Sequence, residues 1–322
     1  MSILVTGGAG YIGSHVVYEL GDAGYETVIL DDLSLGLIQN IDQRAEFVEG
    51  STNNPADLKQ IFSDHHIETV IHLAAWKAAG ESMENPTKYA HNNMIGTINL
   101  LNAALNATVD QIVFSSTAAV YGYPEYLPVD ENHRLAPINF YGFTKLFIED
   151  MLKWYSQLKG LRFAALRYFN AAGYDVKGRI KGKEKNPANL IPVVMEVATR
   201  EREGFEIFGN DYETSDGPGI RDYNHVNDLA SAHVLALEYL KNESTNLIVN
   251  LATGDGHSVL DVVNTTEKIS GKKIPFKVVG RRMGDPAELT AISNLAEDVL
   301  GWTTRYSDLK TILQTTWDIY KK

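Results

Sequence analysis

Short, largely apolar segments alternate with helix-like segments through the first half of the chain. The apolar segments span residues 3–5, 27–30, 45–48, 69–73, 111–115 and 162–167. Between them, apolar side chains recur at helical spacing over residues 11–24, 55–65, 92–107 and 141–160. Short strands that are apolar on both sides, separated by helices, are typical of a parallel sheet covered on both faces. The pattern therefore predicts an α/β fold with a doubly wound, Rossmann-like parallel sheet.

The rhythm changes beyond residue 170. Helices are expected over residues 226–240 and 258–270 and at the C-terminus, with a strand over residues 247–251. Residues 177–185 are basic, contain glycine and show no periodicity. For this segment we predict a surface loop rather than an anion site.

These patterns suggest two interleaved units. We expect a nucleotide-binding unit over residues 1–170 and a mainly substrate-binding region over residues 171–322. Because the strand over residues 247–251 can rejoin the main sheet, segments within about residues 220–255 are expected to return to the first unit.

The first strand runs directly into closely spaced glycines. They form the spacing Gly8-x-Gly10-x-x-Gly13 and also Gly7-x-x-Gly10-x-x-Gly13, and a helix-like segment follows. Such a turn lets backbone N–H groups approach a pyrophosphate, and the helix N-terminus adds partial positive charge. A Cβ atom would block that approach. A glycine pattern alone is a weak signal, but with a strand before it and a helix after it this one predicts dinucleotide binding.

An acidic residue closes the second strand. Asp31 stands at the end of residues 27–30, and Asp32 follows it rather than an arginine. A carboxylate at this position accepts hydrogen bonds from the adenosine ribose hydroxyls and repels a 2′-phosphate. We therefore expect NAD rather than NADP.

Composition narrows the class of protein. The chain has 322 residues, a formal net charge of −12 and no cysteine. The lack of cysteine excludes disulfides and thiolate chemistry. The negative charge argues against nucleic acid or an anionic membrane as a partner, and no apolar run approaches the ~20 residues of a membrane span. We expect a cytoplasmic protein without a metal site, because its nine histidines show no metal-ligand spacing.

Tyr141 and Lys145 open a predicted helix at a spacing that places both on one helical face. A phenol has a pKa of about 10, which is too high for a general base near neutral pH. A lysine ammonium one turn away and the positive nicotinamide of an oxidised cofactor would lower that pKa. Such pairs are common by chance. The preceding strand, which ends in Ser115, Ser116 and Thr117, favours a catalytic site, because the Thr117 hydroxyl can bridge the substrate and the phenol.

Further motifs lie along the whole chain. They are Val5-Thr-Gly-Gly-Ala-Gly-Tyr-Ile-Gly-Ser-His15, Val70-Ile-His-Leu-Ala-Ala75, Phe114-Ser-Ser-Thr117, Arg167-Tyr-Phe-Asn-Ala-Ala-Gly173, Phe208-Gly-Asn-Asp-Tyr212, Arg221-Asp-Tyr-Asn-His-Val226 and Arg281-Arg-Met-Gly-Asp285. Together with Tyr-x-x-x-Lys they resemble the extended short-chain dehydrogenase/reductase superfamily and, within it, the UDP-glucose 4-epimerase family. The glycine turn and Tyr-x-x-x-Lys mark only the superfamily. Arg-Tyr-Phe-Asn, Phe-Gly-Asn-Asp-Tyr and Arg-Asp-Tyr are more specific to sugar-nucleotide epimerases.

The resemblance implies tightly bound NAD. In the family, the positions of Tyr11 and Ile12 lie on the pyrophosphate turn, and those of Lys77 and Asn92 contact ribose or phosphate. The residues implied to bind the cofactor are Gly7, Gly10, Tyr11, Ile12, Gly13, Asp31, Asp32, Ser51, Leu73, Ala74, Ala75, Lys77, Asn92, Tyr141, Lys145 and Phe169.

The resemblance also implies a UDP-sugar substrate. Two of the implied contacts are arginines, whose planar guanidinium groups suit a diphosphate, and Asp285 can accept from a uridine ribose hydroxyl. The residues implied to bind the substrate are Thr117, Asn170, Asn189, Leu190, Phe208, Arg221, Arg282 and Asp285.

The implied reaction is the reversible 4-epimerisation of UDP-galactose and UDP-glucose through a 4-keto sugar, an isomerase step of galactose metabolism. Tyr141 would act as the base, Lys145 as its partner and Thr117 as the relay. A UDP-N-acetylhexosamine or UDP-uronic acid substrate is an alternative, and a non-catalytic nucleotide sensor is another. A sugar-nucleotide 4,6-dehydratase is disfavoured, because Ala118 and Ala119 stand where such enzymes carry an Asp-Glu pair.

The chain departs from the family pattern at a few positions. Asp32 stands where relatives often carry asparagine, Ser51 where they commonly place an aspartate near the adenine, and Thr117 where many have serine. The apolar positions of residues 92–107 and 143–154 can pair with a second copy of the chain. Because relatives form a four-helix bundle from such helices, we expect a homodimer.

Overall fold

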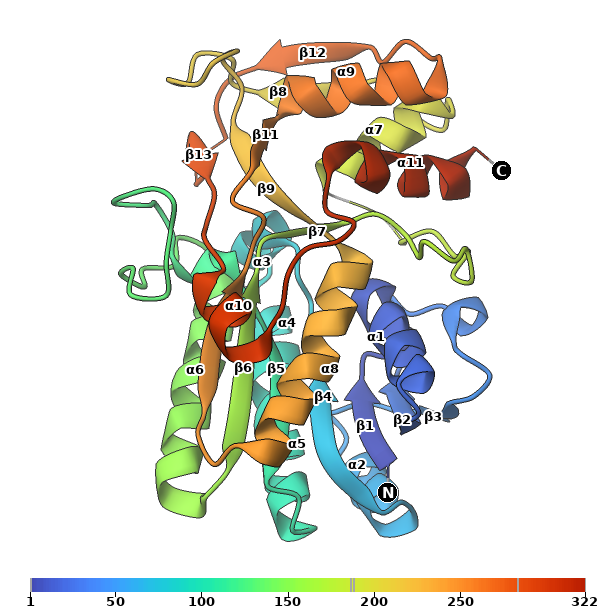
Figure 1. The fold of residues 1–322 in the computed structure, drawn as a ribbon, viewed down its shortest axis with the longest axis vertical. Coiled ribbons are helices and arrows are strands. Elements are labelled where there is room, and N and C mark those ends of the chain that lie inside the picture. The colour runs from blue at the N-terminus through green and yellow to red at the C-terminus, as the bar shows by residue number, and fades with distance from the viewer. Residues whose placement is uncertain (1, 186, 188, 283, 322) are drawn as a thin grey trace.

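The apolar segments of the first half form one parallel sheet in a computed structural model, which describes residues 2–185, 187, 189–282 and 284–321 (Figure 1). Across the described residues its strand order is β10-β6-β5-β4-β1-β2-β3. The chain builds outward from β1 to β3 and then crosses back to β4, so the winding direction reverses between β1 and β4. The predicted doubly wound fold is confirmed. The strands are β1 (Ser2–Thr6), β2 (Glu26–Asp31), β3 (Glu46–Glu49), β4 (Ile67–His72), β5 (Gln111–Thr117), β6 (Arg162–Tyr168) and β10 (Leu247–Leu251).

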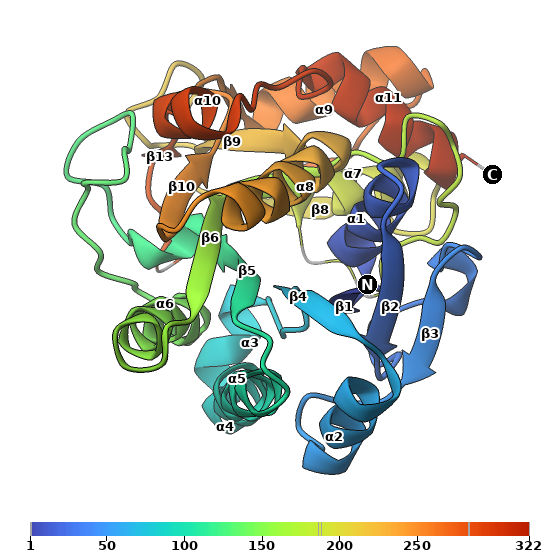
Figure 2. The ribbon, with the colours of Figure 1, turned by 60° about the horizontal axis from the view of Figure 1, so that its bottom comes forward.

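Helices cover both faces of this sheet (Figure 2). α1 (Tyr11–Asp22) and α8 (Val226–Asn242) lie on one face. α2 (Pro55–Asp64), α5 (Gly96–Asn106) and α6 (Phe140–Lys159) lie on the other. Successive strand residues are buried on opposite faces, with Val5 packed toward α1 and Leu4 toward α2. This double burial explains why the strands are apolar throughout.

Short helices and turns follow the carboxyl ends of several strands of the main sheet. Two brief helices, α3 (Ala79–Glu84) and α4 (Pro86–Tyr89), follow β4. The helix expected over residues 92–107 begins as a π-helix (Ala90–Ile95) and continues as α5. Two 3-10 turns, Ile38–Asn40 and Ala118–Val120, follow β2 and β5.

A smaller, mixed region lies over the carboxyl ends of the parallel strands, at the top of Figure 1. Within it β9 pairs with β7, β11 and β13, and β8 pairs with β12. Its strands are β7 (Asn170–Ala172), β8 (Phe205–Phe208), β9 (Ile220–His225), β11 (Gly256–Ser258), β12 (Phe276–Val279) and β13 (Glu288–Leu289). Its helices are α7 (Leu190–Ala198), α9 (Val259–Ser270) and α11 (Leu309–Tyr320), whereas α10 (Asn294–Leu300) packs against β10 of the main sheet and against α8.

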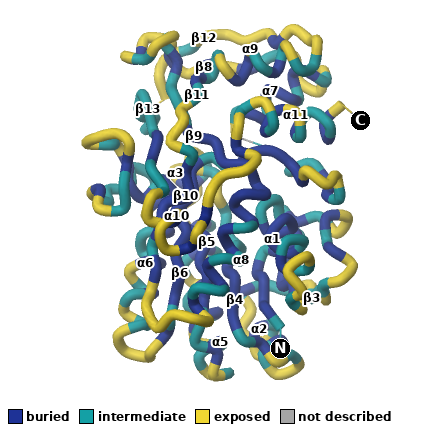
Figure 3. Tube along the Cα trace, viewed as in Figure 1, coloured by how far each residue is buried: buried dark blue, intermediate teal, exposed yellow. Residues whose placement is uncertain are grey.

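The chain passes back and forth between the two regions. After β9 it returns as α8 beside α1, and β10 then pairs in parallel with β6, with Leu247 opposite Ala164. In Figure 3 the buried residues follow the main strands and α8, whereas β12 at the top is exposed. The division of the chain at residue 170 stays a prediction. No helix among the described residues is long and apolar enough to cross a membrane.

Candidate active site

The glycine turn between β1 and α1 leaves no space for side chains. Gly7 has a φ of +75°, and a Cβ on it would lie 2.7 Å from the backbone nitrogen of Ala74. A Cβ on Gly13 would lie 2.0 Å from the carbonyl oxygen of Gly7. α1 begins at Tyr11, and its N-terminus receives no side-chain cap from the described residues. The turn is therefore a tight backbone cradle at the positive end of a helix, which fits a dinucleotide pyrophosphate.

Asp31 ends β2 beside this turn. Its two carboxylate oxygens accept hydrogen bonds from the backbone N–H of Ala9 at 3.0 Å and of Leu33 at 2.9 Å. Burial raises the pKa of Asp31, and these two N–H groups oppose that shift. A carboxylate has about four acceptor positions. Asp31 therefore keeps capacity for the ribose hydroxyls that the sequence assigned to it.

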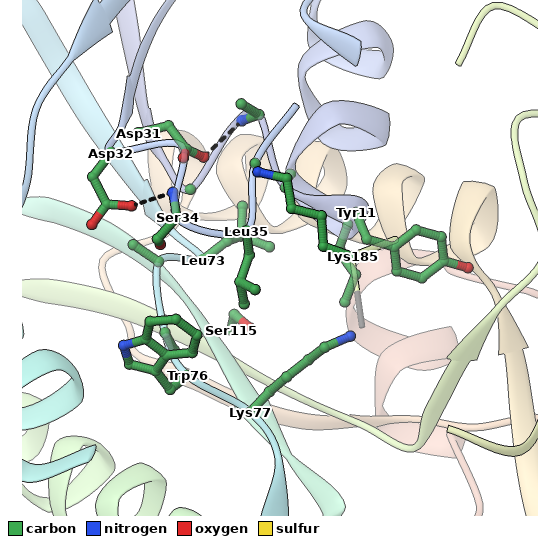
Figure 4. A pocket seen from close by; sticks show the side chains of 18 of the residues that line it. Tyr11, Asp31, Asp32, Ser34, Leu35, Leu73, Trp76, Lys77, Ser115 and Lys185 are labelled. Carbon is green, nitrogen blue, oxygen red and sulfur yellow. Dashed lines mark hydrogen bonds between the residues drawn. The ribbon is translucent and has the colours of Figure 1, made fainter. Parts of the chain in front are cut away.

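The turn, Asp31 and the ends of β4 and β5 line one long pocket (Figure 4). In Figure 4 Asp31 and Asp32 lie at one side of the pocket, with Trp76 and Lys77 below and Tyr11 opposite. Of the predicted cofactor residues, the lining contains Gly7, Gly10, Tyr11, Ile12, Gly13, Asp31, Asp32, Ser51, Leu73, Ala74, Ala75, Lys77, Asn92, Tyr141 and Lys145.

Phe169 is the remaining predicted cofactor residue, and it lies outside that lining. Its ring is buried in a neighbouring apolar cluster with Ala118 and Val120. These two residues form the turn that follows β5. Phe169 therefore supports the strand end that carries Thr117.

Local capping fixes the start of α6 and with it the predicted catalytic pair. The Asn139 side chain accepts a hydrogen bond from the Gly142 N–H at 2.8 Å. The Ser82 hydroxyl accepts one from the Tyr141 N–H at 3.0 Å. An asparagine N-cap is a strong helix start. The cap places Tyr141 in the first turn of α6 and Lys145 one turn later.

Lys145 is buried between α6 and β5. Its Nζ donates to the Ser115 carbonyl at 2.7 Å and lies 5.9 Å from the centroid of the Tyr141 ring. Burial lowers the pKa of Lys145 to about 7, and the charge of Glu149, one turn further along α6, opposes that shift. The lysine is thus held by the strand beside the phenol.

The pKa of the Tyr141 phenol is raised, whereas the sequence analysis expected Lys145 to lower it. Burial raises the pKa of Tyr141 to about 12, and a hydrogen bond with Thr117 partly opposes this. The sequence predicted a lowered pKa from Lys145 and a positive nicotinamide. Among the protein's own groups burial outweighs the lysine, which donates to the Ser115 carbonyl rather than to the phenol. The structure does bring Tyr141, Lys145 and Thr117 together.

A second pocket lies within the smaller region, lined by residues of β7, β8, β9 and the start of α7. All predicted substrate residues line it except Thr117, which stands at the end of β5. They are Asn170, Asn189, Leu190, Phe208, Arg221, Arg282 and Asp285.

Two arginines meet at one carboxylate in this second pocket. Asp285 accepts from Arg282 Nε at 2.9 Å and Nη2 at 3.0 Å, and Arg221 Nη2 lies 3.6 Å from it. The Arg282 guanidinium also lies 5.2 Å from the centroid of the Phe208 ring. The carboxylate holds two guanidinium groups side by side, an arrangement suited to a diphosphate.

The linings of the two pockets come close along the chain where β6 passes into β7. Tyr168 lines the first pocket and Asn170 lines the second, with Phe169 between them in the chain. Tyr141 and Lys145 belong to the lining of the first pocket.

Several pocket residues were missed by the sequence analysis. Tyr168 and Ser115 hydrogen-bond to each other through their hydroxyls, and both line the first pocket. Their signal was present, because each belongs to a motif quoted for the resemblance. Residues 182–185 also line the pocket. Residues 177–185 form a loop as predicted, and no local pattern marks the part of it that lines the pocket.

His72 packs in the core. Its ring nitrogens lie 2.7 Å from the Thr6 hydroxyl and 2.8 Å from the Thr97 hydroxyl. Burial lowers the pKa of His72 to about 3. Within the described ranges no group of three or more His, Cys, Asp or Glu side chains is placed to hold a metal ion.

The glycine cradle, the acidic end of β2 and the Tyr141–Lys145 pair define a dinucleotide-dependent enzyme of the short-chain dehydrogenase/reductase class. The model of the NAD dependent epimerase/dehydratase family matches residues 3–252. A UDP-glucose 4-epimerase from Halalkalibacterium halodurans is 46% identical over 100% of this chain and 96% of its own length. The chain belongs to the NAD dependent epimerase/dehydratase family and, within it, to the UDP-glucose 4-epimerases.

Solved structures agree with this assignment. UDP-glucose 4-epimerase from Brucella ovis, in complex with NAD, has a TM-score of 0.96 and 44% identity, covering 99% of this chain and 98% of that one. The enzyme from Bifidobacterium longum, in complex with NAD+ and UDP, has a TM-score of 0.95 and 34% identity, covering 100% and 98% of the two chains. The predicted fold and the predicted family are confirmed.

Proposed function

We propose that this protein interconverts UDP-galactose and UDP-glucose by inversion at C4 of the sugar, with NAD as its tightly bound cofactor. Relatives named UDP-glucose 4-epimerase, which align along essentially the whole chain, support this activity. The structural observation that carries it is the presence of two pockets lined by neighbouring chain segments. One holds the glycine cradle, Asp31 and Tyr141, and the other holds Arg221 and Arg282.

The dinucleotide pocket fits NAD in both its backbone and its charge. The Gly7–Gly13 turn keeps its tight backbone path because a Cβ on Gly7 or Gly13 would clash with neighbouring backbone. Asp31 suits ribose hydroxyls and disfavours a 2′-phosphate. When bound, NAD+ supplies the hydride acceptor and donor for C4 and a positive ring charge that favours the Tyr141 phenolate.

In the proposed mechanism Tyr141 moves the proton of the sugar C4 hydroxyl. Thr117 hydrogen-bonds to Tyr141 and relays the proton between the sugar oxygen and the phenol. Because burial raises the pKa of Tyr141 to about 12, the phenolate needs positive charge beside it. The Lys145 ammonium, fixed by the Ser115 carbonyl, provides one such charge. Tyr141 accepts the proton as the 4-keto sugar forms and returns it to the same C4 oxygen once the sugar has turned its other face.

The second pocket holds the nucleotide while the sugar turns. Arg221 and Arg282 are proposed to bind the diphosphate, and Asp285 keeps the two guanidinium groups in place. Asn189 and Leu190 start α7 at the wall of the pocket. Anchoring through UDP leaves the 4-keto sugar free to present either face to Tyr141.

A homodimer is also proposed. Exposed apolar side chains lie along the helices on one side of the molecule, with Trp154 61% and Leu158 70% exposed on α6 and Ile95 46% exposed before α5. α5 and α6 lie side by side in Figure 2. A second copy of the chain would bury these apolar side chains. A cytoplasmic location stays a prediction.

The experiment that tests the activity uses the purified protein and UDP-galactose with no added cofactor. Formation of UDP-glucose, followed by NMR, would show 4-epimerisation with retained and regenerated NAD. If UDP-galactose is not converted even when NAD is added, UDP-N-acetylhexosamines and UDP-uronic acids are tested as substrates. Failure with all of them would contradict an enzymatic function and support the non-catalytic sensor.

A further inference from the structure

Residues 182–185, the strap, form part of the wall of the dinucleotide pocket. Gly182 is fixed by Asn40, which accepts from its N–H at 2.8 Å and donates to its carbonyl at 3.3 Å. The Glu184 N–H donates to the Tyr174 hydroxyl at 3.2 Å. Asn40 and Tyr174 are both buried. The strap backbone is therefore held at two points by side chains of the core.

Side chains of the strap reach both walls of the pocket. Lys185 Nζ donates to the Leu33 carbonyl at 3.0 Å, on the wall that carries Asp31. Glu184 forms an ion pair with Lys77, on the opposite wall after β4. In Figure 4 the Lys185 side chain extends toward the Asp31 side, whereas Lys77 extends from the other side toward Tyr11. The strap thus joins the two walls over the dinucleotide site.

The charges of the strap suit this bridging position. The Glu184 side chain is only 16% exposed, and that of Lys77 is 38% exposed. The Glu184 carboxylate alone would repel a nearby pyrophosphate, but its ion pair with Lys77 offsets the negative charge. A partly desolvated pair of this kind is worth more than a pair on the open surface.

We propose that Glu184 and Lys185 belong to the NAD site, and that the Glu184–Lys77 ion pair closes the strap over the bound dinucleotide and slows its release. The proposal rests on the cofactor function proposed above. It deepens that function by naming the residues that retain the cofactor between catalytic cycles. NAD leaves only when the ion pair opens and the strap moves away from the walls.

The test measures NAD release rather than turnover. Protein purified with its NAD is mixed with an excess of an NAD-hydrolysing enzyme, and the NAD still bound is measured over time. We expect Glu184→Gln to release NAD about 5- to 10-fold faster than the wild type, because the variant loses one charged contact. We expect Lys77→Gln to accelerate release too. The double variant should be no faster than the faster single one, because both changes remove the same ion pair.

Lys177→Gln is the matched control. It removes a charge from the same loop outside the strap and outside the pocket lining, where the Lys177 ammonium pairs with Asp22 at 2.7 Å. Its release rate should equal that of the wild type. Unchanged release in a folded Glu184→Gln protein would overturn the inference, as would equal acceleration by Lys177→Gln. A wild type that neither retains nor binds NAD would overturn the proposed function itself.

Discussion

Glu149 and Arg167 form a buried bidentate ion pair, one turn along α6 from Lys145. Arg167 donates to the two Glu149 oxygens at 2.9 and 2.6 Å, and both side chains are at most 3% exposed. The Ser116 hydroxyl donates to the same carboxylate at 2.5 Å. The pair therefore ties α6 to β6 and to the end of β5, next to Thr117.

Replacing Glu149 by glutamine is expected to destabilise the protein strongly. The change leaves the Arg167 charge buried without an opposite charge, which costs about 3–5 kcal/mol of unfolding free energy. Urea unfolding followed by circular dichroism measures the loss. The double variant Glu149→Gln with Arg167→Met removes both charges, so it should lose less than the two single changes added together. Strict additivity would show that the two side chains do not depend on each other.

Replacing Tyr141 by phenylalanine is expected to lower kcat by at least about 10²–10⁴, because the general base is lost. UDP binding should stay close to the wild-type value, since the arginines of the second pocket are untouched. Turnover by NMR and UDP binding by calorimetry test the two halves of this statement. Near-normal turnover would show that another group moves the proton.

Replacing Arg282 by glutamine should weaken UDP-sugar binding about 10- to 100-fold, the range for one charged hydrogen bond to a phosphate. The NAD content of the purified variant should match the wild type, because Arg282 lies in the second pocket only. Calorimetry with UDP gives the affinity, and absorbance gives the NAD content. A variant that keeps full UDP affinity would place the diphosphate elsewhere.

Replacing Gly13 by alanine should abolish NAD retention or prevent folding. The new Cβ would lie 2.0 Å from the Gly7 carbonyl oxygen, so the turn must open. Gly80→Ala is the control, since a Cβ there meets nothing within 4 Å. NAD per chain after gel filtration decides the matter. Full NAD content in a folded Gly13→Ala protein would argue against the cradle.

Acid should destabilise the fold through buried histidines. Burial lowers the pKa of His233 to about 4, whereas an unfolded histidine titrates near 6.5. The unfolded state therefore binds more protons between these values, and stability falls as the pH drops from about 6.5 toward 4. The His233→Leu protein should lose less stability than the wild type between pH 7 and pH 5 by urea unfolding. An equal loss in both proteins would show that His233 does not contribute.

Local spacing in the sequence predicted where the site residues lie, but it did not predict which segments enclose the pocket. The glycines, Asp31 and Tyr141 each stand at the start or end of one element, so their positions follow once the parallel sheet is recognised. The strap does not, because the Glu184–Lys77 contact joins segments far apart in the chain. Strands such as β8 and β13 were also missed, since they are short and depend on pairing with partners elsewhere in the chain.

The pairing of Arg282 with Asp285 shows a further limit. Both residues were assigned through the resemblance, and nothing in their spacing indicated that Asp285 also approaches Arg221. Likewise, the raised pKa of Tyr141 reflects burial that only the folded chain reveals.

The return of α8 and β10 to the main sheet constrains how this molecule can move. Because the polypeptide crosses between its two regions after β6, after β9 and again after β10, no single hinge separates them. Wholesale opening and closing of the two regions is thereby restrained. In the proposed mechanism the reorientation needed for inversion then falls to the sugar ring, which turns about its own diphosphate.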